Sequence, residues 1–263
     1  MTAARPARRS RPSVRGEIPR NPFRVDGPSR LVRVAVLFSG GKDSTYSAYL
    51  ASQLGWQVTH LVSIRPEDPA SMMFHVPNLQ VTPLVAEAMG LPLLEERAGV
   101  GEVEELDALR RAIRRVEVDG IVVGAVASDY QHRRVNRVGH ELGMRVFAPL
   151  WRRDPRRLVR EYLRAGLRIA FSGVSAEGFD ASWLGRVWDD RVVEDLLRLQ
   201  DLRGVHPCGE GGEFETLVLD APFFSKAVDV VRAQPKWSGT SGVWQILEAR
   251  LVPKTDGRAL TEA

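Results

Sequence analysis

A short run of hydroxyl, glycine and charged residues offers the clearest chemistry in the sequence. The run is Ser39-Gly40-Gly41-Lys42-Asp43-Ser44, followed directly by Thr45. Glycines lack Cβ atoms, so backbone amides can approach an anion closely, and a helix beginning here would direct free N–H groups at the same point. Lys42 would add a mobile positive charge for phosphate oxygens, and Asp43 would meet Mg²⁺ directly or through water. The run therefore predicts a nucleotide phosphate site.

The spacing of this run separates it from GxxxxGK[ST], the phosphate loop of kinases and GTPases. The run resembles instead the PP-loop of ATP pyrophosphatases. That resemblance implies ATP as the nucleotide, reaction at its α-phosphate and release of pyrophosphate. The alternative is an ordinary glycine turn before a helix. The motif by itself does not identify the second substrate.

A glycine- and acid-rich segment near residue 210 is the second candidate site. It combines three carboxylates, two glycines and a hydroxyl: Glu210, Glu213, Glu215, Gly211, Gly212 and Thr216. Unpaired carboxylates this close would repel one another, so a cation is expected among them, either Mg²⁺ or a cationic group of a substrate. The glycines leave room for such a group, and Thr216 can fix the loop by bonding the backbone. An acidic surface turn is the alternative.

Further segments narrow the substrate. They are Gly124 to Gln131 (GAVASDYQ), Ala148 to Arg152 (APLWR) and Met73-Phe74-His75, each following a predicted strand. Together with the two sites above, these segments resemble the diphthine–ammonia ligase family over roughly residues 32 to 225. The acidic segment is the specific part of the resemblance, because SGGKDS is shared by many PP-loop enzymes.

The resemblance implies the last step of diphthamide synthesis. In that step the carboxylate of diphthine, a modified histidine on translation elongation factor 2, becomes an amide. ATP would activate the carboxylate as an acyl-adenylate, and ammonia would displace AMP. Oxide is a poor leaving group and AMP a good one, so adenylation makes the amidation feasible. ATP and Mg²⁺ are the implied cofactors, and free ammonia is the expected nitrogen donor because no glutaminase domain is recognisable.

The predicted roles fall into three groups. The catalytic residues are Lys42, Asp43 and Glu213, with Asp43 as the metal ligand. The nucleotide-binding residues are Ser39, Gly40, Gly41, Lys42, Asp43, Ser44, Thr45 and His75. The substrate-binding residues are Ser128, Asp129, Tyr130, Gln131, Glu210, Gly211, Gly212, Glu213, Glu215 and Thr216. The trimethylammonium group of diphthine would suit acids and aromatic faces, with Tyr130 and Trp183 among the latter. A structural role for His75 and core packing for Trp183 are the plainer alternatives.

Alternating strands and helices must position these residues. Apolar, β-branched runs predict strands at 31–38, 58–64, 120–126, 145–148 and 167–172. Helical periodicity predicts helices at 45–54, 81–89, 103–116, 135–142 and 155–166. The alternation predicts an α/β fold with a doubly wound parallel sheet. The resemblance implies the PP-loop, or adenine nucleotide alpha hydrolase-like, type of that fold. Strands at 217–219 and 243–251 indicate a smaller, substrate-facing C-terminal region.

Charge and composition divide the chain further. Residues 1–30 carry a net charge of +6 and the whole chain +4, so the remainder sums to −2. The Arg- and Pro-rich residues 1–30 therefore predict a disordered tail, either a solvated extension or a loose RNA contact. We expect a PP-loop ATP-binding domain at 31–174, a substrate-binding region at 175–253 and a frayed end at 254–263.

Composition also argues against several classes of protein. No apolar run approaches the roughly 20 residues of a membrane span. The single cysteine, Cys208, excludes an internal disulfide and fits a reducing cytoplasm; a small buried thiol is its expected role. A body of charge −2 predicts no stable nucleic-acid contact. A PP-loop tRNA-modifying enzyme and a non-catalytic nucleotide-binding sensor stay as alternatives, and the oligomeric state is open, a homo-oligomer included.

Overall fold

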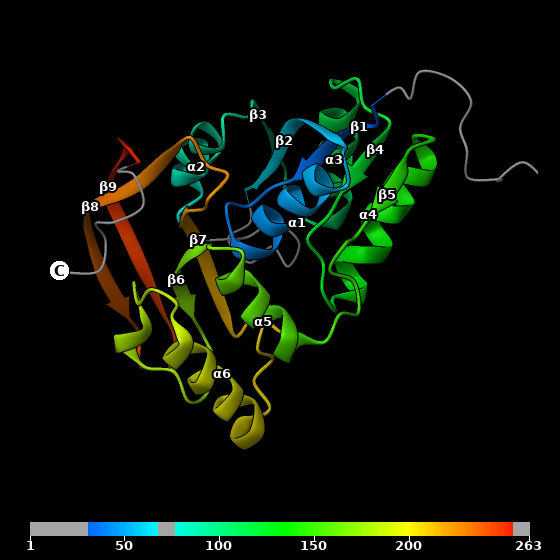
Figure 1. Ribbon diagram of the computed structural model, residues 1–263. Coiled ribbons are helices and arrows are strands. Elements are labelled where there is room, and N and C mark those ends of the chain that lie inside the picture. The colour runs from blue at the N-terminus through cyan, green and yellow to red at the C-terminus, as the bar shows by residue number, and fades with distance from the viewer. Residues whose placement is uncertain (1–30, 68–76, 255–263) are drawn as a thin grey trace, which may run out of the picture. The chain divides into compact units, whose positions relative to one another are not determined.

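The computed structural model describes residues 31–67 and 77–254 of the chain (Figure 1). The predicted disordered tail, His75 and the residues from 255 onward lie outside the described residues. Among the described helices, none is long and apolar enough to cross a membrane.

Five parallel strands form the first sheet, in the order β3-β2-β1-β4-β5. Their bounds are β1 Arg33–Leu37, β2 Gln57–Pro66, β3 Leu93–Ala98, β4 Gly120–Val122 and β5 Arg145–Phe147. The chain extends the sheet from β1 to β3 on one side, then returns to add β4 and β5 on the other. Ligands of such sheets bind beyond the carboxyl ends of the strands at this reversal, which here lies between β1 and β4.

Helices cover both faces of the parallel sheet. Their bounds are α1 Lys42–Gln53, α2 Thr82–Met89, α3 Glu102–Arg114 and α4 Asp129–Glu141. Because side chains alternate along a strand, Val34 and Val36 join the buried cluster that contains α1 and α2. Ala35 and Leu37 face the other way and join the cluster of α3 and α4. The predicted doubly wound α/β sheet is confirmed.

A second sheet of four antiparallel strands has the order β7-β6-β9-β8. The strands of this sheet are β6 Arg168–Val174, β7 Phe214–Asp220, β8 Lys226–Trp237 and β9 Gly242–Pro253, and the helices of this half are α5 Pro155–Arg164 and α6 Asp190–Arg203. Short 3-10 turns lie at η1 Leu79–Val81, between β2 and α2, and at η2 Ala181–Trp183. The strand predicted at 167–172 exists as β6, but its assignment to the parallel sheet was wrong. A buried apolar run predicts a strand without fixing its partners or direction. The domain division at 174/175 stays a prediction.

Local signals explain where two helices begin. Asp154 caps α5, since its carboxylate accepts the backbone N–H groups of Arg156 and Arg157 at 2.8 and 3.2 Å. Helix α4 begins at Asp129, earlier than the predicted 135, because the Ser128 hydroxyl accepts the backbone N–H of Gln131 and caps the helix. The last residues of the GAVASDYQ segment, which follows β4, therefore form the cap and first turn of α4.

Strand β7 of the second sheet runs beside the loop that joins β1 to α1. The backbone N–H of Val218 donates to the carbonyl of Gly40 at 2.9 Å, and the backbone N–H of Lys42 donates to the Thr216 hydroxyl at 3.2 Å. These bonds bring the acidic segment, which precedes and enters β7, against the phosphate loop. They also confirm that Thr216 fixes its loop through a backbone bond.

Candidate active site

The phosphate loop occupies the turn between β1 and α1, as predicted. Gly40 has a φ of +80°, a conformation that favours glycine. A Cβ atom on Gly41 would lie 3.2 Å from the Thr216 carbonyl oxygen and 3.3 Å from the Ser39 hydroxyl. The Ser39 and Ser44 hydroxyls lie 3.2 Å apart, and the Gly41 N–H donates to the Ser39 hydroxyl at 3.3 Å. The glycines thus allow a compact turn that ends at the N-terminus of α1.

The segment after β4 approaches the same helix end. A Cβ atom on Gly124 would lie 2.8 Å from the backbone nitrogen of Ser44, closer than side chains normally come. Gly124 therefore lets the chain that follows β4 pack against the first turn of α1 at the reversal point of the sheet. The sequence analysis singled out the GAVASDYQ segment, but it did not predict that Gly124 would contact the start of α1.

Lys42 is buried, with 2% of its surface exposed. Its Nζ donates to Asp43 Oδ2 at 2.8 Å and to the Cys208 carbonyl at 2.6 Å, and it lies 5.1 Å from the centre of the Phe214 ring. Burial, the largest single influence, would lower the pKa of Lys42, but the charge and hydrogen bond of Asp43 together with Cys208 and Glu210 outweigh it and raise that pKa. The expectation of a mobile charge was wrong, because a buried ammonium must keep its partners. The role of Lys42 toward the nucleotide stays a prediction.

Asp43 has a second partner that sequence reasoning missed. The Tyr162 hydroxyl, on α5, donates to Asp43 Oδ1 at 2.5 Å. Tyr162 is fully buried, and burial, followed by the nearby Asp43 charge, raises its pKa well above the ordinary value. Both Asp43 oxygens thus accept a hydrogen bond before any ligand arrives. No sequence signal links these residues, which lie far apart in the chain.

Glu210 ties the acidic segment to α4. One of its carboxylate oxygens accepts the backbone N–H groups of Val126, Ala127 and Ser128 at 3.1, 2.7 and 2.9 Å. Burial and the Asp43 charge raise the pKa of Glu210, while these backbone donors oppose the rise. Glu210 thus anchors the acidic segment.

Glu213 also bonds to backbone. Its two oxygens accept the N–H groups of His206 and Gly211, each at 2.8 Å. A Cβ atom on Gly211 would lie 2.8 Å from the Glu213 carboxylate, so a larger residue there would displace that carboxylate. Glu213 is not among the residues that line the cavity, and its predicted catalytic role remains untested.

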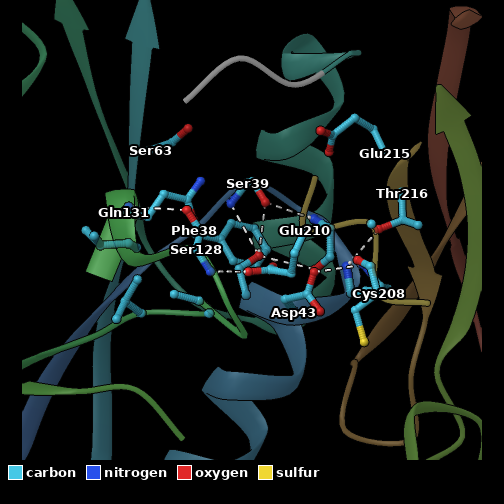
Figure 2. A pocket seen from close by; sticks show the side chains of 18 of the residues that line it. Phe38, Ser39, Asp43, Ser63, Ser128, Gln131, Cys208, Glu210, Glu215 and Thr216 are labelled. Atoms are coloured by element: carbon cyan, nitrogen blue, oxygen red, sulfur yellow. Dashed lines mark hydrogen bonds and ion pairs between the residues drawn. The ribbon is translucent and has the colours of Figure 1, made fainter. Parts of the chain in front are cut away.

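Glu215 differs from both. Its carboxylate lines the cavity, and no hydrogen bond joins it to any residue within 31–67 or 77–254 (Figure 2). Burial raises the pKa of Glu215 to about 7; Lys42 opposes that rise, and the negative charges of Asp43 and Glu210 add to it. Among the three predicted acids, Glu215 is the one whose carboxylate stays available.

The cavity that these residues line has a volume of about 210 Å³. Its polar end joins the phosphate loop to the acidic segment and is lined by Ser39, Gly41, Lys42, Asp43, Ser44, Cys208, Gly209, Glu210, Gly212, Glu215 and Thr216. Its other end lies among the strand ends and α4 and is lined mainly by Leu37, Phe38, Val62, Ser63, Ile64, Leu79, Val123, Ala125, Ser128, Gln131 and Val135. Figure 2 shows Ser128 and Gln131 on one side of this cavity and Glu215 and Thr216 on the other.

Four predicted substrate residues lie outside this cavity lining: Gly211 and Glu213 of the acidic segment, and Asp129 and Tyr130 of α4. Asp129 accepts a bidentate contact from Arg152, both distances being 3.1 Å. The Tyr130 ring lies 3.3 Å from the guanidinium of Arg134, and its hydroxyl donates to Glu102. Tyr130 therefore already contacts a cation of the protein, and its substrate role stays a prediction.

Two further residues discussed in the sequence analysis, Trp183 and Cys208, are buried in the core. Trp183 and Trp188 pack against Phe171 in the core, at ring-centre distances of 5.1 and 5.5 Å. Core packing, the plainer alternative for Trp183, is confirmed. Cys208 is free and buried, as expected, and burial raises the pKa of its thiol.

The residues present suit a nucleotide. Gly41, Lys42 and Ser44 line the cavity at the N-terminus of α1, where an anion is favoured, and the apolar end of the cavity can take a flat heterocycle. Within the described residues, no group of three His, Cys, Asp or Glu side chains could hold a metal ion. One carboxylate, such as that of Asp43, would suffice for a Mg²⁺ ion that keeps water and phosphate oxygens as its other ligands, and the metal role of Asp43 stays a prediction.

Comparison with family models covers most of the chain. The diphthamide synthase N-terminal domain matches residues 32–146, and the diphthamide synthase C-terminal domain matches residues 154–252.

Individual proteins agree with the family models. The chain is 37% identical over 219 residues to a diphthine–ammonia ligase of Danio rerio, covering 75% of this chain and 86% of that protein. It is 35% identical over 217 residues to a diphthine–ammonia ligase of Schizosaccharomyces pombe, covering 75% of this chain and 36% of that longer protein. A solved structure titled as a predicted subunit of tRNA methyltransferase from Methanocaldococcus jannaschii has a TM-score of 0.40 and 19% identity, over 73% of this chain and 98% of that chain. Similarity at that level does not bear on function.

Proposed function

This chain belongs to the diphthamide synthase family, and on that premise we propose that it amidates diphthine to diphthamide with ATP and ammonia. The enzyme class is a carbon–nitrogen ligase that releases AMP and pyrophosphate. The acceptor is diphthine on translation elongation factor 2, in the cytoplasm. The printed name of the relatives supports the reaction, whereas the carrier protein and the compartment belong to the proposal.

One observation carries this proposal: the phosphate loop and the acidic segment line a single cavity. A ligase of this kind must hold the α-phosphate of ATP and the acceptor carboxylate together, because the acyl-adenylate forms directly between them. Lys42 joins the two segments through Asp43 and the Cys208 carbonyl. The arrangement thus suits a reaction between two bound substrates.

The phosphate loop and the apolar end of the cavity would hold ATP. Phosphates would lie at the N-terminus of α1, where backbone N–H groups and the helix dipole favour anions. The base would lie among apolar side chains such as Val62, Ile64 and Leu79. Asp43 would orient Mg²⁺, and the buried positive charge of Lys42 would counter charge that develops at the α-phosphate.

The acidic side of the cavity would take the acceptor. The carboxylates of Glu210 and Glu213 already bond to backbone, so Glu215 is the acid left to face an incoming group. The single buried cysteine does not favour the sulfur-transfer type of tRNA modification, which uses paired cysteines. Amide formation is the chemistry that fits both family and site.

The test supplies the purified protein with diphthine-bearing elongation factor 2, ATP, Mg²⁺ and ammonium. We expect AMP and pyrophosphate in equal amounts, and loss of one negative charge at the modified histidine, detected by peptide mass spectrometry. Unmodified elongation factor 2 is the control and should give neither product. Formation of ADP and phosphate alone, or nucleotide cleavage without an amide, would contradict the proposed reaction.

A further inference from the structure

Among the acids of the cavity, Glu215 has a carboxylate that no described group engages. Glu210 accepts three backbone N–H groups and Glu213 accepts two, whereas the Glu215 side chain faces the cavity without a hydrogen bond to any described residue. In Figure 2 no dashed line reaches it. A carboxylate in that state is available to a ligand.

Within residues 31–67 and 77–254, the one positive charge that acts on the pKa of Glu215 is Lys42, which already has partners. Lys42 donates to Asp43 and to the Cys208 carbonyl, and the remaining titratable neighbours, Asp43 and Glu210, are negative. Burial among these groups raises the pKa of Glu215 to about 7. The site therefore attracts a small cation and binds a proton near neutral pH.

Besides Mg²⁺ and the trimethylammonium group of the acceptor, the proposed reaction brings ammonium to this cavity. Ammonia in neutral water is almost entirely ammonium, since amines hold their proton well above pH 7. Ammonium has no lone pair and cannot attack a carbonyl carbon. An ammonia-dependent ligase therefore needs a group that binds ammonium and removes one proton beside the activated carboxyl.

We propose that Glu215 receives ammonium in the cavity and acts as the general base that converts it to ammonia. This inference rests on the proposed ligase function. Ammonium transfers one proton to the Glu215 carboxylate. The nitrogen lone pair then forms the C–N bond at the acyl carbon, the C–O bond to AMP breaks, and a second proton leaves to solvent. Glu215 returns its proton to solvent before the next turnover.

The experiment separates activation of the carboxylate from attack by nitrogen. Adenylation is followed by exchange of labelled pyrophosphate into ATP in the presence of diphthine-bearing elongation factor 2, without ammonium. Ligation is followed with two nucleophiles, ammonium and hydroxylamine. Hydroxylamine is uncharged at neutral pH, so its attack does not require a base to free its lone pair.

In Glu215→Gln we expect kcat for pyrophosphate exchange at saturating acceptor to stay within about twofold of wild type, whatever the change in KM for the acceptor. Ligation of ammonium should fall about 100-fold, the usual scale for losing a general base, whereas hydroxamate formation should stay near the wild-type rate. In the wild type, kcat/KM for ammonium should rise with pH around 7, and the variant should lose that step. Glu215→Asp, which keeps a carboxylate, should recover part of the ammonium rate.

Glu248→Gln is the matched control, because Glu248 lies on β9 in an exposed pair with Arg232, and it should behave as wild type. Loss of pyrophosphate exchange in Glu215→Gln would overturn the inference, since Glu215 would then serve adenylation. An equal loss with both nucleophiles would also overturn it. Absence of exchange in the wild type would instead refute the ligase function and, with it, this inference.

Discussion

At the scale of single residues, the site depends on a buried hydrogen-bonded chain. Tyr162 donates to Asp43, Asp43 accepts from Lys42, and Lys42 donates onward to the Cys208 carbonyl. Each charge in this chain has a partner, which offsets the cost of burial. The chain also fixes both charged side chains of the phosphate loop in one orientation, which electrostatic catalysis requires.

Tyr162→Phe tests this chain by removing one hydroxyl. Asp43 Oδ1 then loses its donor, so we expect the free energy of unfolding to fall by about 1–3 kcal/mol. Pyrophosphate exchange should slow about 10-fold, and the Mg²⁺ concentration for half-maximal rate should rise, because Asp43 is no longer held. Tyr49→Phe is the control, since Tyr49 on the neighbouring α1 stacks on Phe223 at 4.9 Å. Equal behaviour of the two variants would assign Tyr162 a packing role only.

Glu215 predicts a pH dependence of stability that needs no activity assay. Its pKa is about 7 in the folded chain, above the ordinary value, so the folded state binds the proton more tightly than the unfolded state. The free energy of unfolding should therefore fall as pH rises from about 4.5 through 7, by up to about 3 kcal/mol from this group. Glu215→Gln should remove that part of the decline. Urea unfolding of both proteins at pH 5 and pH 8 measures it, and parallel curves would show that Glu215 is not buried as described.

At the scale of elements, patterns with a local cause were predictable. The strand, the glycine turn and α1 follow from an apolar run, two glycines and helical periodicity within one stretch of chain. One helix and two strands were not predicted, and neither were the short 3-10 turns. β3 mixes apolar and charged residues, α6 buries few side chains, and β8 contains Pro235, which disfavours an inner strand. β8 lies at a sheet edge, where proline is tolerated.

The acidic segment shows where sequence reasoning stops. Sequence identified three clustered acids, but the division of labour among them depends on loop geometry. The partners of Glu210 lie on the start of α4, more than 80 positions earlier, and those of Glu213 lie within its own loop. Only the folded backbone determines which carboxylate is left facing the cavity.

The contact between Glu210 and the start of α4 gives a prediction at this scale. Glu210→Ala removes the acceptor of three backbone N–H groups, so we expect the free energy of unfolding to fall by about 1–3 kcal/mol. KM for the acceptor should rise because the acidic segment loses its anchor. Glu141→Ala, at the other end of α4, removes an exposed pair with Arg137 and a partly buried pair with Arg110, and should cost about 1 kcal/mol. An unchanged KM would show that the segment holds its shape without α4.

At the scale of the molecule, the cavity draws on both halves of the chain. The first family model ends before α5 and the second begins at residue 154, yet residues from both halves line the same cavity. The bonds of β7 to the phosphate loop couple them. The two matched regions therefore both contribute to one cavity, whereas the roles of an ATP-binding domain and a substrate region stay predictions.

Removal of residues 1–30 tests how much of the chain the reaction needs. The family match begins at residue 32, and the cavity lining lies between residues 37 and 216. We expect the shortened protein to keep kcat and KM for ATP within about twofold. A large loss of turnover at saturating substrates would mean that the Arg-rich segment contributes to the site.

The burial of Lys42 makes the chain unusually easy to probe with amine-reactive reagents. The sequence has only four lysines, and Lys226, Lys236 and Lys254 lie outside the core. An acylating reagent should label these three rapidly and leave Lys42 unmodified until the contact between β7 and the phosphate loop opens. The rate of Lys42 labelling, read by mass spectrometry against three internal references, thus reports how often that contact opens, and slower labelling with ATP would show that the nucleotide holds it closed.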